Sequence, residues 1–158
     1  MLAEIQTELI TQLGLDQVSF IPLSQPITIS FYNKWLDHNY YGTMNYLKEH
    51  ADFKMDPRKI NPDYRSVITV TQSYFPAVNP ASVPLPARTA MYAQNNDYHF
   101  WLKEKLNQAI QLLQAKYPNE IFAPYVDSGP ILEKDLGYRA GHGWFGKNSC
   151  LIHPQKGS

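Results

Sequence analysis

The chain has 158 residues, of which 44% are hydrophobic and only 18% are charged, a balance typical of one globular domain and not of a disordered segment. Fourteen basic side chains cancel fourteen acidic ones, so the overall basic charge of most nucleic-acid binders is absent. A single cysteine excludes a disulfide framework and, within this chain, an iron–sulfur or cysteine-rich zinc site. No apolar run reaches the length of a membrane span and no signal peptide opens the chain, so we expect a cytoplasmic protein with no membrane partner.

Hydrophobic periodicity and glycine or proline boundaries divide the chain into helices and short strands. A β-branched run, Val-Ile-Thr-Val, lies within residues 66–74, and the longest helix begins at Asp97 and ends before Pro118. The first half of the chain is expected to form a helix over 2–13 stopped by Gly14, a strand over 17–21, a helix through Trp35 and Leu36 capped by Ser30, a helix over 44–50 capped by Thr43, and a strand over 66–74. The long helix follows, with a buried stripe of Leu102, Leu106, Ala109, Ile110 and Leu113. After it we expect a strand over 121–126, a helix from Pro130 to near Gly141, and an apolar run over 150–152. This order predicts one layered α+β domain over residues 1–158.

Two segments are expected to lie outside regular structure. Residues 51–65 alternate charges and prolines, which predicts a solvated connection, and the mixed signs argue against a phosphate-binding strip. The prolines between positions 76 and 86 predict an extended loop, because proline cannot donate to a central strand.

The stretch 125–158 is the strongest candidate for a ligand site. An apolar run ends in the carboxylate of Asp127, and Gly141, Gly143 and Gly146 later surround Trp144. Glycines allow the backbone to come close to something large. Together with a placed acid and a flat aromatic ring, they indicate a ligand site.

Two familiar glycine motifs match this stretch by letter only. The three glycines fit a dinucleotide fingerprint, and with Lys147 they resemble a phosphate loop. Both motifs require a strand before the glycines, whereas a helix is predicted there, and Asn148 stands where the phosphate loop needs Ser or Thr. We therefore reject both interpretations.

Single residues leave alternatives open. Asp127 is either a general acid tuned by an enclosed site or a helix cap or salt-bridged acid. His99, in the polar cluster Asp97-Tyr98-His99 at a helix start, favours a structural role by itself. The residues interpreted as ordinary are His38, His50, His142 and His153, which lack metal-ligand spacing, and Cys150, a small buried hydrophobe.

Five segments in fixed order carry a family resemblance. They are residues 40–47 (YYGTMNYL), residues 56–58 (DPR) leading to 65–68 (RSVI), Tyr92-Ala93 with residues 97–99 (DYH), residues 126–130 (VDSGP) with 132–133 (LE), and residues 140–148 (AGHGWFGKN) followed by Gly157-Ser158. This order resembles the N-terminal domain of the epoxyqueuosine reductases, the cobalamin-dependent oxidoreductases of queuosine biosynthesis in tRNA. The similarity covers nearly the whole chain.

The resemblance implies an enzyme that removes the epoxide oxygen of epoxyqueuosine at the tRNA wobble position, in a two-electron reduction that releases water. It implies a nitroreductase-like fold, with a mixed or antiparallel sheet and helices on its faces, that holds cobalamin with its lower base detached. Asp127 would supply a proton to the departing oxygen, and a dry, enclosed site would raise its pKa for that task. The implied cofactor-binding residues are Tyr98, His99, Ser128, Gly141, Gly143, Trp144, Gly146, Lys147 and Asn148, the substrate-side candidates are Tyr41 and Met44, and no side chain is expected to bind a metal ion.

The chain also departs from the family pattern. Met91 stands where relatives usually have an arginine, and Asn95-Asn96 where they have Gly-Arg, so positive charge is lost near the site. Relatives continue into a further strand, a region with two four-iron four-sulfur clusters, and helical repeats. We therefore expect a fragment truncated at its C-terminus that is inactive alone. In the full-length protein, the expected partners are tRNA with a GUN anticodon and an external electron donor, and an exposed sheet edge would allow a homodimer.

Two other functions stay open. One is a cobalamin-binding or carrier module without redox activity, which the missing cysteines fit equally well. The other is a structural or interaction domain in which the glycine-rich stretch is only a tight turn.

Overall fold

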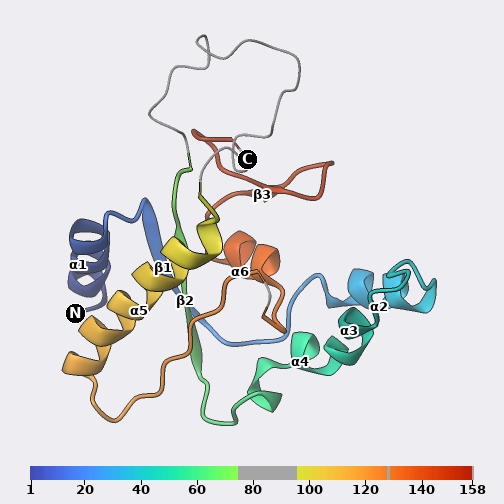
Figure 1. The fold of residues 1–158 in the computed structure, drawn as a ribbon, viewed down its shortest axis with the longest axis horizontal. Coiled ribbons are helices and arrows are strands. Elements are labelled where there is room, and N and C mark those ends of the chain that lie inside the picture. Colours follow the sequence, from blue (N-terminus) through green and yellow to red (C-terminus); the bar gives the residue numbers. More distant parts are fainter. Residues whose placement is uncertain (75–95, 128, 158) are drawn as a thin grey trace.

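A two-stranded antiparallel sheet of β1 (Gln17–Pro22) and β2 (Ser66–Thr71) forms the centre of the chain in the computed structural model, which describes residues 1–74, 96–127 and 129–157 (Figure 1). The strands pair from Gln17 opposite Thr71 to Pro22 opposite Ser66. Side chains alternate between the two faces of a strand, so each face of this sheet has its own neighbours.

One face of the sheet carries the hydrophobic core. Val18 is fully buried there and packs with Leu9 of α1 (Leu2–Leu13) and with Leu113 of α5 (Tyr98–Lys116). Both helices therefore cover the same face (Figure 1). The core is closed at the end of α1 by Gly14, whose φ of 61° is the left-handed conformation that glycine adopts without strain.

The opposite face of the sheet is held by polar contacts. His142, which follows α6 (Glu133–Arg139), is buried and lies 2.8 Å from Thr69 Oγ1 and 3.0 Å from Gln17 Oε1. Thr69 and Gln17 alternate with the core residues Val18 and Ile68 along their strands. The segment after α6 therefore packs on the face that α1 and α5 leave open.

The helices between β1 and β2 form a separate arm. Figure 1 shows α2 (Ile29–Asp37), α3 (Asn45–Glu49) and α4 (Ala51–Met55) projecting together to one side of the sheet, and the short 3-10 helix η1 (Pro57–Lys59) leads back to β2. Asp135 of α6 anchors the arm, since its buried carboxylate accepts hydrogen bonds of 2.9 Å from both the backbone N–H and the hydroxyl of Thr28. Thr28, not Ser30, is thus the N-cap position of α2.

The described residues confirm the α+β class and most predicted elements, including the long helix, in which Asp97 caps α5 with its side chain. The predicted strand over 121–126 is wrong, because these residues run as irregular chain. The helix expected from Pro130 begins only at Glu133, and the N-cap of α3 is Met44 and not Thr43. Residues 51–65, expected as a solvated connection, contain α4 and η1. The proline-rich loop over 76–86 lies outside the described residues.

A β-hairpin closes the described chain. β3 (Trp144–Phe145) pairs antiparallel with β4 (Leu151–Ile152), and both strands pack against α6. The apolar run predicted over 150–152 thus supplies β4. Among the described residues, no helix is long and apolar enough to cross a membrane.

Candidate functional site

Asp127 occupies a sharp turn just before α6. Its φ of 52° lies in the left-handed region, which Asp tolerates better than most residues because of its short polar side chain. The carboxylate accepts a hydrogen bond from the Tyr98 hydroxyl and lies 3.5 Å from His99 Nε2. The turn therefore directs the acid at the first turn of α5.

The start of α5 is organised by its cap. Asp97 Oδ1 accepts a 2.9 Å hydrogen bond from the backbone N–H of His99 and lies 2.7 Å from His99 Nδ1. The ring of His99 stacks on that of Tyr98, with centroids 4.3 Å apart and planes at 23°. Asp97 therefore orients His99 so that its other ring nitrogen faces Asp127. Asp97, Tyr98 and His99 are the polar cluster that the sequence indicated.

The Asp127 carboxylate changes the pKa of its neighbour Tyr98. The Asp127 carboxylate accepts the hydrogen bond of the Tyr98 hydroxyl, which together with burial and the negative charges of Asp127, Asp97 and Glu133 raises the pKa of Tyr98 to about 12. Tyr98 therefore stays a hydrogen-bond donor at all physiological pH values.

The surroundings of Asp127 differ from those expected. Its side chain is 51% exposed, so the described residues do not form the dry enclosure that a neutral carboxylic acid was expected to need. A second carboxyl near Asp127 has an oxygen atom that is shielded from solvent.

That carboxyl is Glu133, the first residue of α6. Its Oε1 atom is shielded from solvent and has no hydrogen-bond partner among the described residues. Burial, and then the negative charge of Asp127, raise the pKa of Glu133. The sequence analysis quoted Glu133 only as part of a family segment, and the one available signal was an acid at a helix start, which is common.

A buried lysine lies near Glu133. Lys54 of α4 is 8% exposed, and its Nζ donates to the backbone carbonyl of Ile131 at 3.4 Å and lies 5.7 Å from the ring centroid of Tyr32. Burial lowers the pKa of Lys54, and the charge of Glu133 opposes this effect. Residue 54 belongs to the segment predicted as a solvated connection, so its burial was not anticipated.

An apolar groove of about 840 Å³ adjoins this group of residues. Its walls are α1, α5, β2, the irregular segment before Asp127, and α6. Tyr98 and Glu133 line it together with Asp127. The predicted buried stripe of α5 divides here. All five residues line the groove, but Ala109 and Leu113 are buried, whereas Leu102, Leu106 and Ile110 are only partly buried.

The three glycines near Trp144 have internal reasons for their small size. A Cβ atom on Gly143 would lie 2.1 Å from the carbonyl oxygen of Ile152, and one on Gly146 would lie 2.6 Å from Ile152 Cδ1. Gly141 has a φ of 79° and open space around it. Packing against β4 therefore requires glycine at 143 and 146. Of the three glycines, only Gly141 leaves its backbone open to another molecule.

The remaining hairpin candidates lie on its outer side. Trp144 is 48% exposed and Phe145 is also exposed, with its ring centroid 5.2 Å from that of Tyr138. Lys147 is exposed, and Asn148 Oδ1 accepts a 3.1 Å hydrogen bond from the Cys150 backbone N–H. Because α6 begins at Glu133 and the hairpin packs on α6, this helix connects the Asp127 turn to the hairpin.

The substrate-side candidates lie on the arm. Tyr41 is buried, packs against Trp35 and donates a 3.0 Å hydrogen bond to Asn39 Oδ1. Met44 is partly exposed, and the Tyr46 hydroxyl lies 3.8 Å from its sulfur. Neither residue shares the groove beside Asp127. Ser128, Met91 and Asn95 lie outside the described residues, and Asn96 directly precedes the α5 cap and is exposed.

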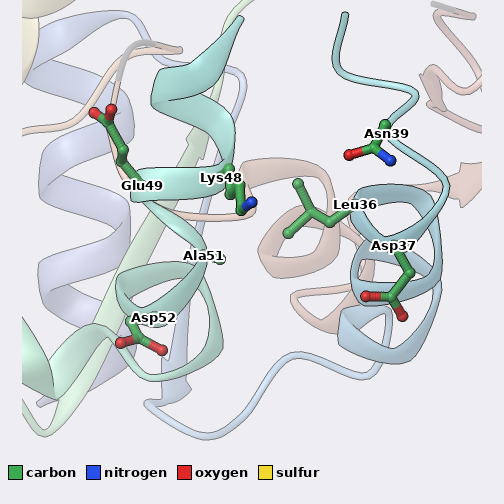
Figure 2. Close-up of a pocket in the computed structure, with 7 residues that line it drawn as sticks. All are labelled: Leu36, Asp37, Asn39, Lys48, Glu49, Ala51 and Asp52. Carbon is green, nitrogen blue, oxygen red and sulfur yellow. The ribbon is translucent and has the colours of Figure 1, made fainter.

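The arm also has a hollow of about 510 Å³ between the end of α2 and the pair α3–α4. Figure 2 shows Leu36 and Lys48 pointing toward this hollow, whereas Glu49 points away from it. Its lining residues are Leu36, Asp37, Asn39, Lys48, Glu49, Ala51 and Asp52. Three carboxylates against one ammonium disfavour an anionic ligand here, and none of the predicted site residues lines the hollow. Within the described ranges, no three His, Cys, Asp or Glu side chains are grouped closely enough to hold a metal ion.

The described geometry defines an α+β domain that presents a loop carboxylate, held by a tyrosine and a histidine, beside an apolar groove. Residues 54–128 match the family model "Epoxyqueuosine reductase QueG, DUF1730". The epoxyqueuosine reductase of Cyclobacterium marinum is 36% identical over 145 residues, which cover 92% of this chain and 46% of that relative.

Solved structures agree. A crystal structure of epoxyqueuosine reductase with a tRNA-Tyr epoxyqueuosine-modified tRNA stem loop superposes with a TM-score of 0.72 at 20% identity, over 99% of this chain and 42% of that one. The structure from Bacillus subtilis, with its catalytic aspartate loop swung out of the active site, gives 0.70 at 20% identity, over 100% and 43%. These comparisons confirm the resemblance to the epoxyqueuosine reductases, which are oxidoreductases. The chain spans less than half the length of the relatives it matches.

Proposed function

We propose that residues 1–158 are the cofactor-binding domain of an epoxyqueuosine reductase, which reduces epoxyqueuosine to queuosine at the tRNA wobble position. The observation that best supports this proposal is the loop carboxylate of Asp127, which accepts a hydrogen bond from the Tyr98 hydroxyl and faces His99. The chain also resembles these reductases along most of its length. The Bacillus subtilis enzyme also carries a catalytic aspartate on a loop. Asp127 would accordingly deliver a proton to the departing epoxide oxygen.

The cofactor of this proposal is cobalamin, held by a nitroreductase-like domain. When bound, its reduced cobalt supplies the two electrons of the reduction. The exposed rings of Trp144 and Phe145 and the open backbone at Gly141 fit a flat macrocycle fringed with amides, which needs aromatic faces and main-chain partners. Tyr98, His99, Ser128, Lys147 and Asn148 complete the proposed binding residues. Gly143 and Gly146 act indirectly, by allowing the hairpin to close against β4.

The partners of the proposed enzyme follow from the same family. A related structure contains a tRNA-Tyr stem loop. For this chain we propose tRNA with a GUN anticodon, approached by Tyr41 and Met44, and an external electron donor that acts through two four-iron four-sulfur clusters of the full-length protein. We further propose a cytoplasmic location. Within the described residues β1 and β2 pair only with each other, so a second copy could add to the sheet edge.

A visible-absorption titration with cob(II)alamin tests the cofactor proposal. We expect a base-off spectrum on binding, weakened by Trp144→Ala and retained by Asp127→Asn. Phe31→Ala is the matched control, because it removes an exposed aromatic ring from α2 and not from the hairpin. An unchanged spectrum with the unmodified chain, or an equal loss in the Phe31→Ala control, would contradict the proposed site.

A further inference from the structure

A buried lysine contacts the loop between Asp127 and α6. Lys54 of α4 is 8% exposed, and its Nζ donates to the backbone carbonyl of Ile131 at 3.4 Å. Ile131 lies four residues after Asp127 and two before Glu133, the first residue of α6. A lysine ammonium is seldom buried, because its partners must offset the loss of hydration. The burial of Lys54 against this loop therefore indicates a specific role.

The arm holds the same ammonium from its other side. Lys54 Nζ lies 5.7 Å from the ring centroid of Tyr32 in α2, within the range of a cation–π interaction. The Tyr32 hydroxyl in turn donates a 2.7 Å hydrogen bond to the backbone carbonyl of Leu47 in α3. The lysine thus connects the three helices of the arm to the loop that leads from Asp127 to α6.

The end of this loop has little support of its own. Leu132 is the N-cap position of α6, and no side chain among the described residues caps the helix there. α6 has seven residues, and a helix that short depends on tertiary contacts. Asp135 ties the body of α6 to Thr28, but it lies beyond the loop. Lys54 acts at Ile131, between Asp127 and the helix.

We propose that Lys54 is a positioning residue: by holding the Ile131 carbonyl, it keeps the loop in the conformation that presents Asp127 to Tyr98 and His99. This inference rests on the proposed function for the task of Asp127 as the proton donor. The Asp127 φ of 52° is a conformation that non-glycine residues keep only where the surroundings hold it. Four residues of extended chain span about 14 Å, so a loop released at Ile131 gives Asp127 room to leave both partners.

The first test uses Tyr98 as a reporter of the position of Asp127. The pKa of Tyr98 is raised to about 12, first by its hydrogen bond to Asp127, and should fall toward 10 when the carboxylate leaves. Carbon-13 NMR at the tyrosine Cζ carbons, assigned with Tyr98→Phe, measures this pKa. We expect Lys54→Met to shift it toward 10, as Asp127→Asn does. Lys54→Arg, which keeps a cation, should restore most of the value.

Lys48→Met is the matched control, because it removes an exposed lysine from α3 of the same arm. We expect it to leave the pKa of Tyr98 near 12. An unchanged Tyr98 pKa in Lys54→Met, or an equal shift in Lys48→Met, would overturn the inference.

The second test separates positioning from a general loss of stability. The Leu136 backbone N–H donates to the Leu132 carbonyl in the first turn of α6, whereas Leu113 lies in the core part of α5. In amide hydrogen exchange, we expect Lys54→Met to reduce the protection of Leu136 and to leave that of Leu113 unchanged. An equal loss of protection at both amides would mean a merely structural role and would refute the proposal.

The third test measures the reaction, in single turnovers with chemically reduced cobalamin and an epoxyqueuosine stem loop. Lys54→Met should slow queuosine formation by up to about 10²-fold, with cobalamin binding unchanged, and Lys54→Arg should recover most of the rate. An unchanged rate in Lys54→Met would contradict the positioning role. No product with the unmodified chain would instead contradict the proposed function, and the NMR and exchange results would still decide whether Lys54 positions Asp127.

Discussion

Gly143→Ala tests why the glycine-rich stretch has its composition. The added Cβ would lie 2.1 Å from the Ile152 carbonyl oxygen and 2.7 Å from its carbonyl carbon. Contacts of this kind rarely fall below about 3.2 Å, so the backbone of β4 would have to move by roughly 1 Å, and such overpacking costs about 1–3 kcal/mol. For a chain of this size, that corresponds to a decrease in Tm of roughly 3–10 °C.

Gly42→Ala is the matched control for this change. Gly42 has a φ of 59° but nothing within 4 Å of its Cβ position, so alanine there brings backbone strain of about 1 kcal/mol without a clash. Gly143 lacks the positive φ, and its cost is steric alone.

Thermal unfolding and amide hydrogen exchange of β3 and β4 measure the outcome. We expect Gly143→Ala to lower the Tm more than Gly42→Ala does and to accelerate exchange in the hairpin. A variant with the stability and hairpin protection of the unmodified chain would refute the steric reasoning. In that case, contact with a ligand would explain why residue 143 is a glycine. The same clash means that a loss of cobalamin binding in a Gly143 variant would not by itself locate the cofactor.

Three further predictions follow from buried and charged groups. Burial lowers the pKa of His142 below 6.5, so the unfolded chain binds more protons and stability should fall as pH drops from 7 to 5, an effect that His142→Gln should remove in urea titrations. Asp135→Asn should cost about 3–5 kcal/mol in the same assay, because it leaves Arg139, whose side chain is only 15% exposed, without its ion-pair partner. Ultraviolet titration should show Tyr98 ionising near pH 12, and Asp127→Asn should move its pKa toward 10; an unchanged value would contradict their hydrogen bond.

Local patterns predicted the elements that depend on local sequence. The stop of α1 at Gly14, the cap of α5 at Asp97 and the β-branched strand β2 each follow from residues close together in the chain. The strand expected over 121–126 was wrong because strand formation does not depend on local sequence alone. An apolar run becomes a strand only when another strand pairs with it. Among the described residues, none does.

The site was only partly readable from the sequence. The cluster of Asp97, Tyr98 and His99 was visible, and the structure adds the contact of Tyr98 and His99 with Asp127. The burial of Glu133 and its approach to Lys54 depend on packing between segments almost 80 positions apart, which no local pattern reports. The clash that requires Gly143 likewise depends on the hairpin register.

The most direct test of the proposed reductase is a single-turnover reaction of the chain with chemically reduced cobalamin and an epoxyqueuosine-containing stem loop with a GUN anticodon. Mass spectrometry would follow the loss of one oxygen from the modified base. The chain alone is expected to be inactive because it lacks electron delivery, and chemical reduction of the cobalamin replaces that delivery. We therefore expect queuosine to form faster than in a control without protein, and Asp127→Asn to slow it about 10²-fold or more while Glu104→Gln leaves the rate unchanged. Queuosine formed at the rate of the control without protein, or at an unchanged rate in Asp127→Asn, would contradict the account.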